Sequence, residues 1–330
     1  MNLTPMIEAN MNVTKICAVA VPGGASATST ITITVIICTR DRGTLIEATL
    51  TSILTGTRRP DELLVVDQSD GRDTRDAVER IAAREDVVRY LPTPTRGLSR
   101  ARNVGLEQSR GGLIVFTDDD VVAERDWLIE IAREFQTYPR LAFLFGTVLP
   151  PDGYDWETEK IPYSRVPTKR PVRWFQKEVF GGMGANMALR RTTFEQIGGF
   201  DTMLGAGTEV AGCEDYEYAL RCVCFRPSLE MHLLDTARVV HHAGARSGPD
   251  YHAFVHQING TGMGLFWAYL FRTRNLKYKV KAVRSLLAPL GAFLGQVLRG
   301  RKLSGLRTYA YCLKGFGRGI ARALGGGRTR

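Results

Sequence analysis

The stretch GLIVFTDDDV at residues 112–121 places three carboxylates directly after an apolar run. Leu113–Thr117 predicts a buried strand, and Asp118, Asp119 and Asp120 follow at its end. Neighbouring carboxylates repel one another and resist burial, so they either face water in a turn or share a hard divalent cation. The stretch alone favours the turn, because Asp is common in turns.

Segments around this stretch alternate between strand and helix patterns. Strands are predicted at 31–38, 62–67, 87–91 and 113–117, and helices at 45–54, 73–85 and 97–109. Such alternation is typical of a parallel sheet with helices on both faces. We therefore predict an α/β, Rossmann-like fold with a mostly parallel sheet.

Three polar clusters fall at predicted strand ends, namely Thr39–Arg42, Asp67–Asp70 and Asp118–Asp120. In open α/β sheets, ligands bind in the crevice at the carboxyl ends of the strands. Convergence of three clusters there favours a cation site over an isolated turn. The sequence has neither G-x-G-x-x-G after the first strand nor a P-loop, so a cation would neutralise the phosphates of a bound nucleotide.

Seven segments follow one another within residues 32–245, namely ITVIICTRDR, LLVVDQSDG, RGLSRARNVGL, FTDDD, GGMGANMALRR, IGGFDTMLGAGTEVAGCEDYEYALR and ARVVHH. In this order they resemble the motifs of family 2 glycosyltransferases with the GT-A fold. The first four resemble the family's opening strand, second strand, A-R-N helix and D-x-D element. The next two resemble its acceptor-side segments, and the last resembles its His-bearing strand. One departure is Phe225–Glu230, which lacks the Gly usual before the last strand and leaves its register open.

The resemblance implies a divalent cation, Mg²⁺ or Mn²⁺, in the crevice. It assigns Asp120 as a direct ligand, Asp118 to the donor's ribose or the metal shell, and His241 as a further ligand. His242 is the alternative to His241, and either could instead bond a backbone carbonyl. We expect residues 118–120 to be extended, so that the first and third side chains face one side.

The resemblance also implies residues that bind a nucleoside diphosphate sugar donor. The predicted set is Thr39, Arg40, Asp41, Asp67, Ser69, Arg102, Asn103, Asp118 and Asp119. Asp67 would accept hydrogen bonds from the base or ribose, or merely cap the next helix. Arg40 could be a surface charge, and Arg102 could pair with a strand-end carboxylate instead of contacting the donor.

An acidic pair, Glu214-Asp215, opens the helix predicted at 216–222. Acids at a helix N-terminus are also simply stabilising, by about 0.3–1 kcal/mol. A sugar hydroxyl attacks efficiently only as its proton is removed. The resemblance implies that Asp215 is this general base in a single displacement with inversion, while Glu214 supports the acceptor or orients the loop.

Aromatic and small residues come between these motifs. Trp174 and Phe175 could stack on a sugar, although aromatic residues are more often part of the core. Gly182–Asn186 lets backbone approach a ligand closely, and we expect it to form a wall facing donor and acceptor.

Charge is unevenly distributed along the 330 residues, whose formal net charge is +10. Residues 251–330 hold 15 Lys and Arg with no Asp or Glu, whereas residues 1–250 hold 29 basic and 34 acidic side chains. Leucine and aromatic runs among the bases favour a helical basic C-terminal extension lying on an anionic membrane. Nucleic acid is the less favoured partner, and packing on the preceding domain is a third option.

We predict a flexible leader at 1–30, a GT-A domain at 31–250 and an amphipathic tail at 251–330.

Together these features predict a metal-dependent inverting glycosyltransferase of the hexosyl or deoxyhexosyl class. It would act on a glycan or lipid-linked acceptor in cell-surface polysaccharide or glycolipid synthesis. The alternative is a non-catalytic module that binds a nucleotide sugar or glycan.

Six cysteines without a C-x-x-C pair indicate reduced thiols, and a signal peptide is the less favoured interpretation of the leader. We expect a cytoplasmic protein, peripheral on the inner face of the cell membrane.

Overall fold

The protein is described by a computed structural model that covers residues 31–154, 162–172, 181–208, 212–225 and 229–242, with five isolated positions beyond them. The chain divides into two compact units, Met1–Thr30 and Ile31–Arg330, and every described residue belongs to the second. The predicted leader lies outside the described residues, as does the predicted tail apart from those five positions. In the described part, no helix is long and apolar enough to cross a membrane.

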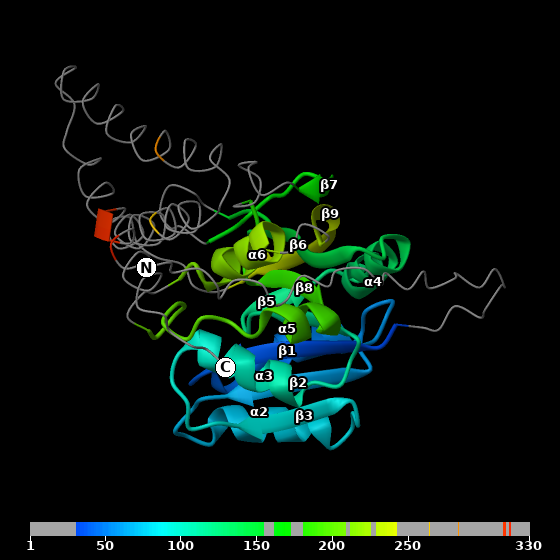
Figure 1. The fold of residues 1–330 in the computed structure, drawn as a ribbon. Coiled ribbons are helices and arrows are strands. Elements are labelled where there is room, and N and C mark those ends of the chain that lie inside the picture. Colours follow the sequence, from blue (N-terminus) through cyan, green and yellow to red (C-terminus); the bar gives the residue numbers. More distant parts are fainter. Residues whose placement is uncertain are drawn as a thin grey trace, which may run out of the picture. The chain divides into compact units, whose positions relative to one another are not determined.

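One nine-stranded sheet, in the order β3-β2-β1-β4-β8-β6-β9-β5 with β7 paired to β9, forms the centre of the described part (Figure 1). The strands are β1 (Ile33–Thr39), β2 (Glu62–Asp67), β3 (Val88–Pro92), β4 (Leu113–Thr117), β5 (Val121–Ala123), β6 (Leu141–Leu149), β7 (Lys169–Val172), β8 (Asn186–Arg190) and β9 (Glu230–His241). Strands β3, β2, β1 and β4 are parallel neighbours, and β6 and β9 run the same way, while β8, β5 and β7 run against them. The mostly parallel sheet and its first four strands are confirmed.

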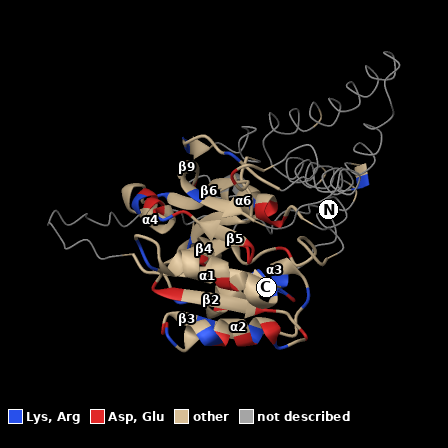
Figure 2. Cartoon of the chain, turned by 180° about the vertical axis from the view of Figure 1, so that it is seen from behind, with Lys and Arg blue, Asp and Glu red and all other residues tan. Residues whose placement is uncertain are grey.

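Helices cover both faces of this sheet, as predicted. They are α1 (Ile46–Leu54), α2 (Asp73–Ala82), α3 (Leu98–Gln108), α4 (Trp127–Thr137), α5 (Arg191–Ile197) and α6 (Glu214–Phe225), with a short 3-10 turn η1 (Gly43–Leu45). Figure 1 views the sheet from the side of α3, α5 and α6, and Figure 2 from the side of α1, α2 and α4. In Figure 2 residues coloured as Lys, Arg, Asp and Glu recur along α2, whereas the strands of the sheet are mostly tan.

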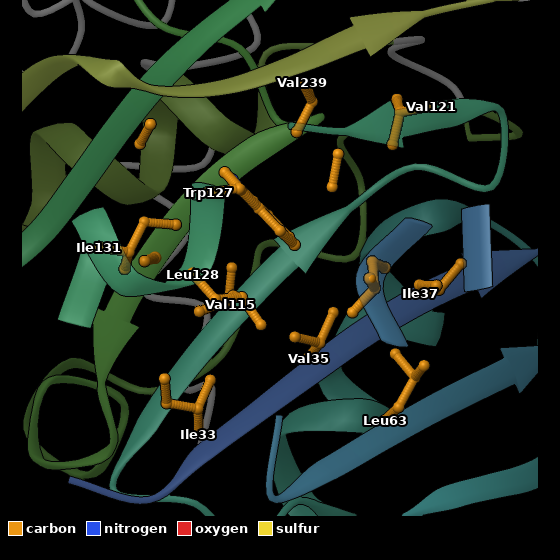
Figure 3. Packing of buried hydrophobic residues seen from close by; sticks show 14 of the residues in the cluster. Ile33, Val35, Ile37, Leu63, Val115, Val121, Trp127, Leu128, Ile131 and Val239 are labelled. Carbon is orange, nitrogen blue, oxygen red and sulfur yellow. The ribbon is translucent and has the colours of Figure 1, made fainter. Parts of the chain in front are cut away.

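Each face has its own apolar core because the central strands are buried on both sides. On the α1 and α4 side, Val115 of β4 packs near Trp127 and Leu128 of α4, and Val121 and Val239 close the cluster above them (Figure 3). Full burial of an aliphatic or aromatic side chain stabilises a fold by about 1.5–3 kcal/mol. These contacts hold β5 and β9 against the body of the sheet, and so fix the end of β9.

A buried amide ties the two parts of the sheet together where β8 begins. Asn186 is inaccessible to solvent, and its Nδ2 donates to the carbonyl oxygens of Thr147 and Ala237, each at 2.9 Å. Its Oδ1 accepts the indole N–H of Trp127 at 2.9 Å. The pairing of β6 with β9 also shifts register between Gly146 and Thr147, where β9 bulges. Asn186 therefore fixes the bulge from which β9 continues toward His241.

Candidate active site

The acidic run lies in a chain reversal between β4 and β5. Asp119 and Asp120 form a turn, so the expected extended conformation of residues 118–120 is wrong for these two. Both are buried, with 5% and 9% of their surfaces exposed. The reversal occurs because β5 pairs antiparallel with β9, which runs in the direction of β4. Asp118 and Asp120 converge through this turn rather than through strand alternation.

Asp118, Asp120 and His241 form a compact group of possible cation ligands. One carboxylate oxygen of each Asp and one imidazole nitrogen all lie within 4.8 Å of one another. The register pairs Val121 with His241, which places the imidazole Nε2 3.3 Å from Asp120 Oδ1. His242 is exposed and meets Asp120 only through its backbone N–H, at 2.9 Å from the Asp120 carbonyl oxygen. Of the two histidines, His241 is therefore the one placed to bind a cation.

This donor set fits a divalent cation. Two carboxylates and one imidazole suit Mn²⁺ and similar transition metals, and the oxygens also suit Mg²⁺. His241 Nδ1 is buried and has no hydrogen-bond partner among the described residues. Burial, with Asp120 adding to it and Arg102 opposing it, raises the pKa of Asp118. A cation would relieve the repulsion between these carboxylates.

Arg42 is a member of the site that the sequence did not single out. Its Nε lies 3.1 Å from Asp119 Oδ1, and its Nη2 lies 3.4 Å from Asp120 Oδ2. Burial raises the pKa of Asp119 to about 6, and the guanidinium of Arg42 opposes that rise. Arg42 follows Asp41, whose positive φ of 55° turns the chain after β1. The signal was its place in the polar break 39–42, but the direction of its side chain depends on this turn.

The ends of β1 and β2 are tied together by hydrogen bonds. Thr39 and Asp67 are register partners in neighbouring strands, and both are buried. Ser69 Oγ accepts the backbone N–H of Asp41 at 2.7 Å and donates to Asp67 Oδ1 at 2.5 Å. Asp67 Oδ2 accepts the hydroxyl of Tyr90 at 2.8 Å. Both oxygens of Asp67 are thus held by the protein, and its contact with a nucleobase or ribose stays a prediction.

Arg40 lies on the surface. Its side chain is about half exposed and pairs at 3.2 Å with Asp41, which is equally exposed. Arg40 is therefore a surface charge, the alternative to its predicted contact with the donor. Exposed pairs of this kind contribute little to stability.

Arg102 joins the two sides of the crevice. Only 2% of its surface is exposed, and its Nη1 donates to Glu214 Oε1 at 2.7 Å while its Nη2 lies 3.7 Å from Asp118 Oδ1. Burial lowers the pKa of the Arg102 guanidinium, but Glu214 and Asp118 outweigh this and raise it above its usual value. Arg102 therefore pairs with a strand-end carboxylate, the alternative to a donor contact. A Cβ on Gly184 would come within 2.7 Å of its Nη2, which is why glycine suits that position.

Asn103, the next residue of α3, holds a loop. Its Nδ2 donates to the carbonyl oxygen of Phe200 at 2.9 Å, and its Oδ1 accepts the Phe200 N–H at 2.6 Å. Both ends of the amide are occupied by backbone, so a role of Asn103 in donor binding stays a prediction without a contact to support it.

Asp215 is held by two backbone N–H groups at the start of α6. Its Oδ2 accepts the N–H of Gly184 at 2.7 Å, and its Oδ1 accepts the N–H of Tyr216 at 2.8 Å. Burial and the adjacent Glu214 raise the pKa of Asp215 to about 7, with Arg102 opposing. A carboxylate of this pKa is suited to take a proton near neutral pH.

The predicted wall Gly182–Asn186 contains residues that face the site and residues that do not. Gly184 lines the site through its N–H on Asp215, whereas Asn186 is fully buried in the sheet and does not face the crevice. The expectation for Asn186 was therefore wrong, because its amide is used to join β6, β8 and β9. Trp174 and Phe175 lie outside the described residues.

The sequence profile of glycosyl transferase family 2 matches residues 34–198, which is half of the chain. A glucosyl-dolichyl phosphate glucuronosyltransferase of Haloferax volcanii is 27% identical over 182 residues, covering 52% of this chain and 57% of that protein. An uncharacterized glycosyltransferase of Haemophilus influenzae is 25% identical over 129 residues, covering 38% of this chain and 40% of that protein. The chain thus spans about half the length of these curated relatives.

Solved structures share the fold at low sequence identity. Residues 1–349 of S. aureus TarS superpose with a TM-score of 0.60 at 16% identity, over 89% of this chain and 82% of that one. The mannosyltransferase PcManGT from Pyrobaculum calidifontis, in complex with GDP-Man and Mn²⁺, gives 0.56 at 21% identity, over 89% and 88%. TarS 1–349 in complex with UDP-GlcNAc gives 0.57 at 17% identity, over 88% and 82%. The fold is of the GT-A type.

We predict that Arg102→Met destabilises the protein far more than Arg100→Met on the same helix. Removing Arg102 leaves Glu214 and Asp118 without their buried partner, which costs about 3–5 kcal/mol. Arg100 is exposed, so its loss should change stability by less than about 0.5 kcal/mol. Urea unfolding of both variants measures the difference.

The double variant Arg102→Met/Glu214→Gln tests the cause. It should recover part of the lost stability, because the main uncompensated charge is gone. Equal stability of Arg102→Met and Arg100→Met would contradict the pairing.

Proposed function

This chain belongs to glycosyl transferase family 2, and on that premise we propose that it transfers a sugar from a nucleoside diphosphate sugar to an acceptor hydroxyl. The transfer would be a single displacement with inversion, with Asp215 as the general base and a divalent cation at the acidic turn. It would belong to the hexosyl or deoxyhexosyl class, and serve the synthesis of a cell-surface polysaccharide or glycolipid.

One observation carries this proposal. The buried guanidinium of Arg102 lies between Asp118, a member of the possible cation site, and Glu214, the neighbour of Asp215. A carboxylate that would bind the cation and a carboxylate with a pKa of about 7 are therefore joined through one buried side chain. A single displacement requires such an arrangement. The leaving diphosphate must be stabilised while the attacking hydroxyl is deprotonated, so both groups must be held in place together.

Asp118, Asp120 and His241 would hold the cation. When bound, Mg²⁺ or Mn²⁺ would neutralise the negative charge that develops on the departing diphosphate. The Mn²⁺ and GDP-Man in the PcManGT complex support a cation and a nucleotide sugar as the ligands. The UDP-GlcNAc complex of TarS supports the same donor class with a different base and sugar.

Asp215 would remove the proton of the acceptor hydroxyl. The N–H groups of Gly184 and Tyr216 fix its two oxygens, so the carboxylate cannot rotate freely. Glu214 is held by Arg102 and would position the start of α6 rather than take the proton. Burial keeps Asp215 basic enough to act near pH 7.

The acceptor and the cellular site complete the proposal. The name of the Haloferax relative includes a glucosyl-dolichyl phosphate, which supports a lipid-linked acceptor here, with a glycan as the other choice. The basic segment 251–330 supports attachment to the inner face of the cell membrane.

We predict that Asp215→Asn lowers sugar transfer by about 10²- to 10⁴-fold while cation-dependent nucleotide binding is retained, because only the proton acceptor is lost. Transfer is measured with UDP- and GDP-sugars, Mn²⁺ and a panel of glycan and lipid-linked acceptors. Binding of UDP and GDP is measured by calorimetry. Glu195→Gln, an exposed carboxylate on α5, is the matched control and should transfer at the normal rate. Normal transfer by Asp215→Asn would exclude Asp215 as the base.

The raised pKa of Asp215 also predicts the pH dependence. The active form is the deprotonated carboxylate, so activity is lost as pH falls through the pKa of about 7. With donor, acceptor and Mn²⁺ saturating, kcat should fall about tenfold per pH unit below the pKa and level off above it. A bound cation would move the midpoint downward, because it favours the charged carboxylate. A kcat that is constant from pH 8 to pH 5 would contradict this assignment.

A further inference from the structure

Arg42 and the possible cation ligands share a carboxylate. Asp120 Oδ2 lies 3.4 Å from Arg42 Nη2, and Asp120 Oδ1 lies 3.3 Å from His241 Nε2. Both oxygens of Asp120 therefore already face a nitrogen. A cation held by Asp118, Asp120 and His241 would use one of these oxygens and would lie beside the guanidinium.

The guanidinium of Arg42 and a cation bound at Asp120 would repel each other, because both are positive and both would contact this one carboxylate. The guanidinium of Arg42 cannot lose its charge in a protein, so it cannot give way by deprotonation. Its attraction to Asp120 therefore competes with cation binding, unless the side chain moves or a new anion arrives. Asp119, which also pairs with Arg42, is outside the ligand group and can keep the arginine nearby.

The side chain of Arg42 is partly exposed, whereas its backbone is anchored. With 37% of its surface exposed, the side chain has room to change partners. In contrast, Thr74 Oγ1 accepts the backbone N–H groups of Arg42 at 3.2 Å and Gly43 at 3.0 Å. The loop after β1 is thus anchored on α2, with a long cationic side chain reaching over the acidic turn.

A nucleoside diphosphate is the anion that would complete this arrangement. A diphosphate bound beside the cation presents several oxygens, and a guanidinium forks well onto such groups. Arg42 would then exchange Asp120 for a phosphate oxygen. That exchange removes the competition for Asp120 and adds a contact to the donor.

Resting on the proposed function, we infer that Arg42 couples the cation to the nucleotide: it weakens cation binding alone and strengthens binding of the cation with a nucleoside diphosphate. Arg42 would consequently favour retention of the cation while the donor is bound, and its release together with the product diphosphate. Arg42 is a donor-binding residue in this scheme, and the coupling is reciprocal between cation and nucleotide.

The test is a titration of Mn²⁺ followed by the EPR signal of free Mn²⁺, with and without saturating UDP or GDP. The variants are Arg42→Gln, Arg42→Lys and the control Arg75→Gln, which removes an equally charged side chain from an exposed pair on α2. Without nucleotide, Arg42→Gln should bind Mn²⁺ about tenfold more tightly than the wild type. With nucleotide, the enhancement seen in the wild type should fall by about tenfold or more in Arg42→Gln.

Arg42→Lys should fall between the wild type and Arg42→Gln in both measurements, because it keeps the charge but not the fork. Arg75→Gln should match the wild type. The inference is overturned if Arg42→Gln binds Mn²⁺ no more tightly than the wild type without nucleotide, or keeps the full enhancement with it. It is also overturned if neither nucleotide enhances Mn²⁺ binding in the wild type.

Mn²⁺ binding by Asp120→Asn distinguishes failure of this inference from failure of the proposed function. If the proposed cation site is wrong, Asp120→Asn would bind Mn²⁺ as well as the wild type does, whatever the result with Arg42.

Discussion

A buried arginine is the constraint on which the site depends. Arg102 carries a full positive charge with only 2% of its surface exposed, and such a charge must be paired. Its partners come from opposite sides of the crevice: Asp118 follows β4 and Glu214 begins α6. A shift of either carboxylate would remove one of the two charged partners of the buried guanidinium. The turn that would hold a cation and the helix that carries Asp215 are therefore fixed relative to each other by one side chain.

The sheet brings His241, the third possible cation ligand, to the acidic turn. Asn186 fixes the bulge at which the pairing of β9 with β6 changes register, and the second part of β9 then pairs with β5. That pairing puts His241 beside Val121, one residue after the acidic turn. Packing of Val121 and Val239 around Trp127 buries the same region on the α4 side (Figure 3). A structural amide and an apolar cluster thus decide the position of a candidate metal ligand.

Much of this arrangement could be predicted from the sequence, because it depends on local pattern. The β-branched run of β1 and the apolar periodicity of α1 are visible within ten residues, and alternation of such elements implies the parallel sheet. The crevice followed from the polar residues at strand ends. The acidic run alone favoured a turn, but its position beside His241 could not be predicted, because it is set by pairing with β9, about 120 residues later. Asn103 and Asn186 were likewise placed by distant backbone partners that no local pattern reveals.

Arg42 was missing from the predicted site residues for a different reason. The polar break at 39–42 was recognised, but the positive φ of Asp41 turns the chain and directs Arg42 onto Asp119 and Asp120. Strand alternation gives no direction for a side chain beyond such a turn. The result is a site in which fixed carboxylates meet one fixed arginine, Arg102, and one exposed arginine, Arg42. In the proposed scheme, Arg102 is a permanent partner of the acidic turn and Arg42 an exchangeable one.

We propose above all that Asp118, Asp120 and His241 hold one divalent cation beside the diphosphate of the donor. Pulsed EPR of Mn²⁺ bound together with UDP or GDP tests it directly, using protein labelled with ¹⁵N in histidine. We predict a coupling from one directly bound imidazole nitrogen that disappears in His241→Gln and persists in His242→Gln. Bound Mn²⁺ without any nitrogen coupling, or with a coupling that survives His241→Gln, would contradict the account.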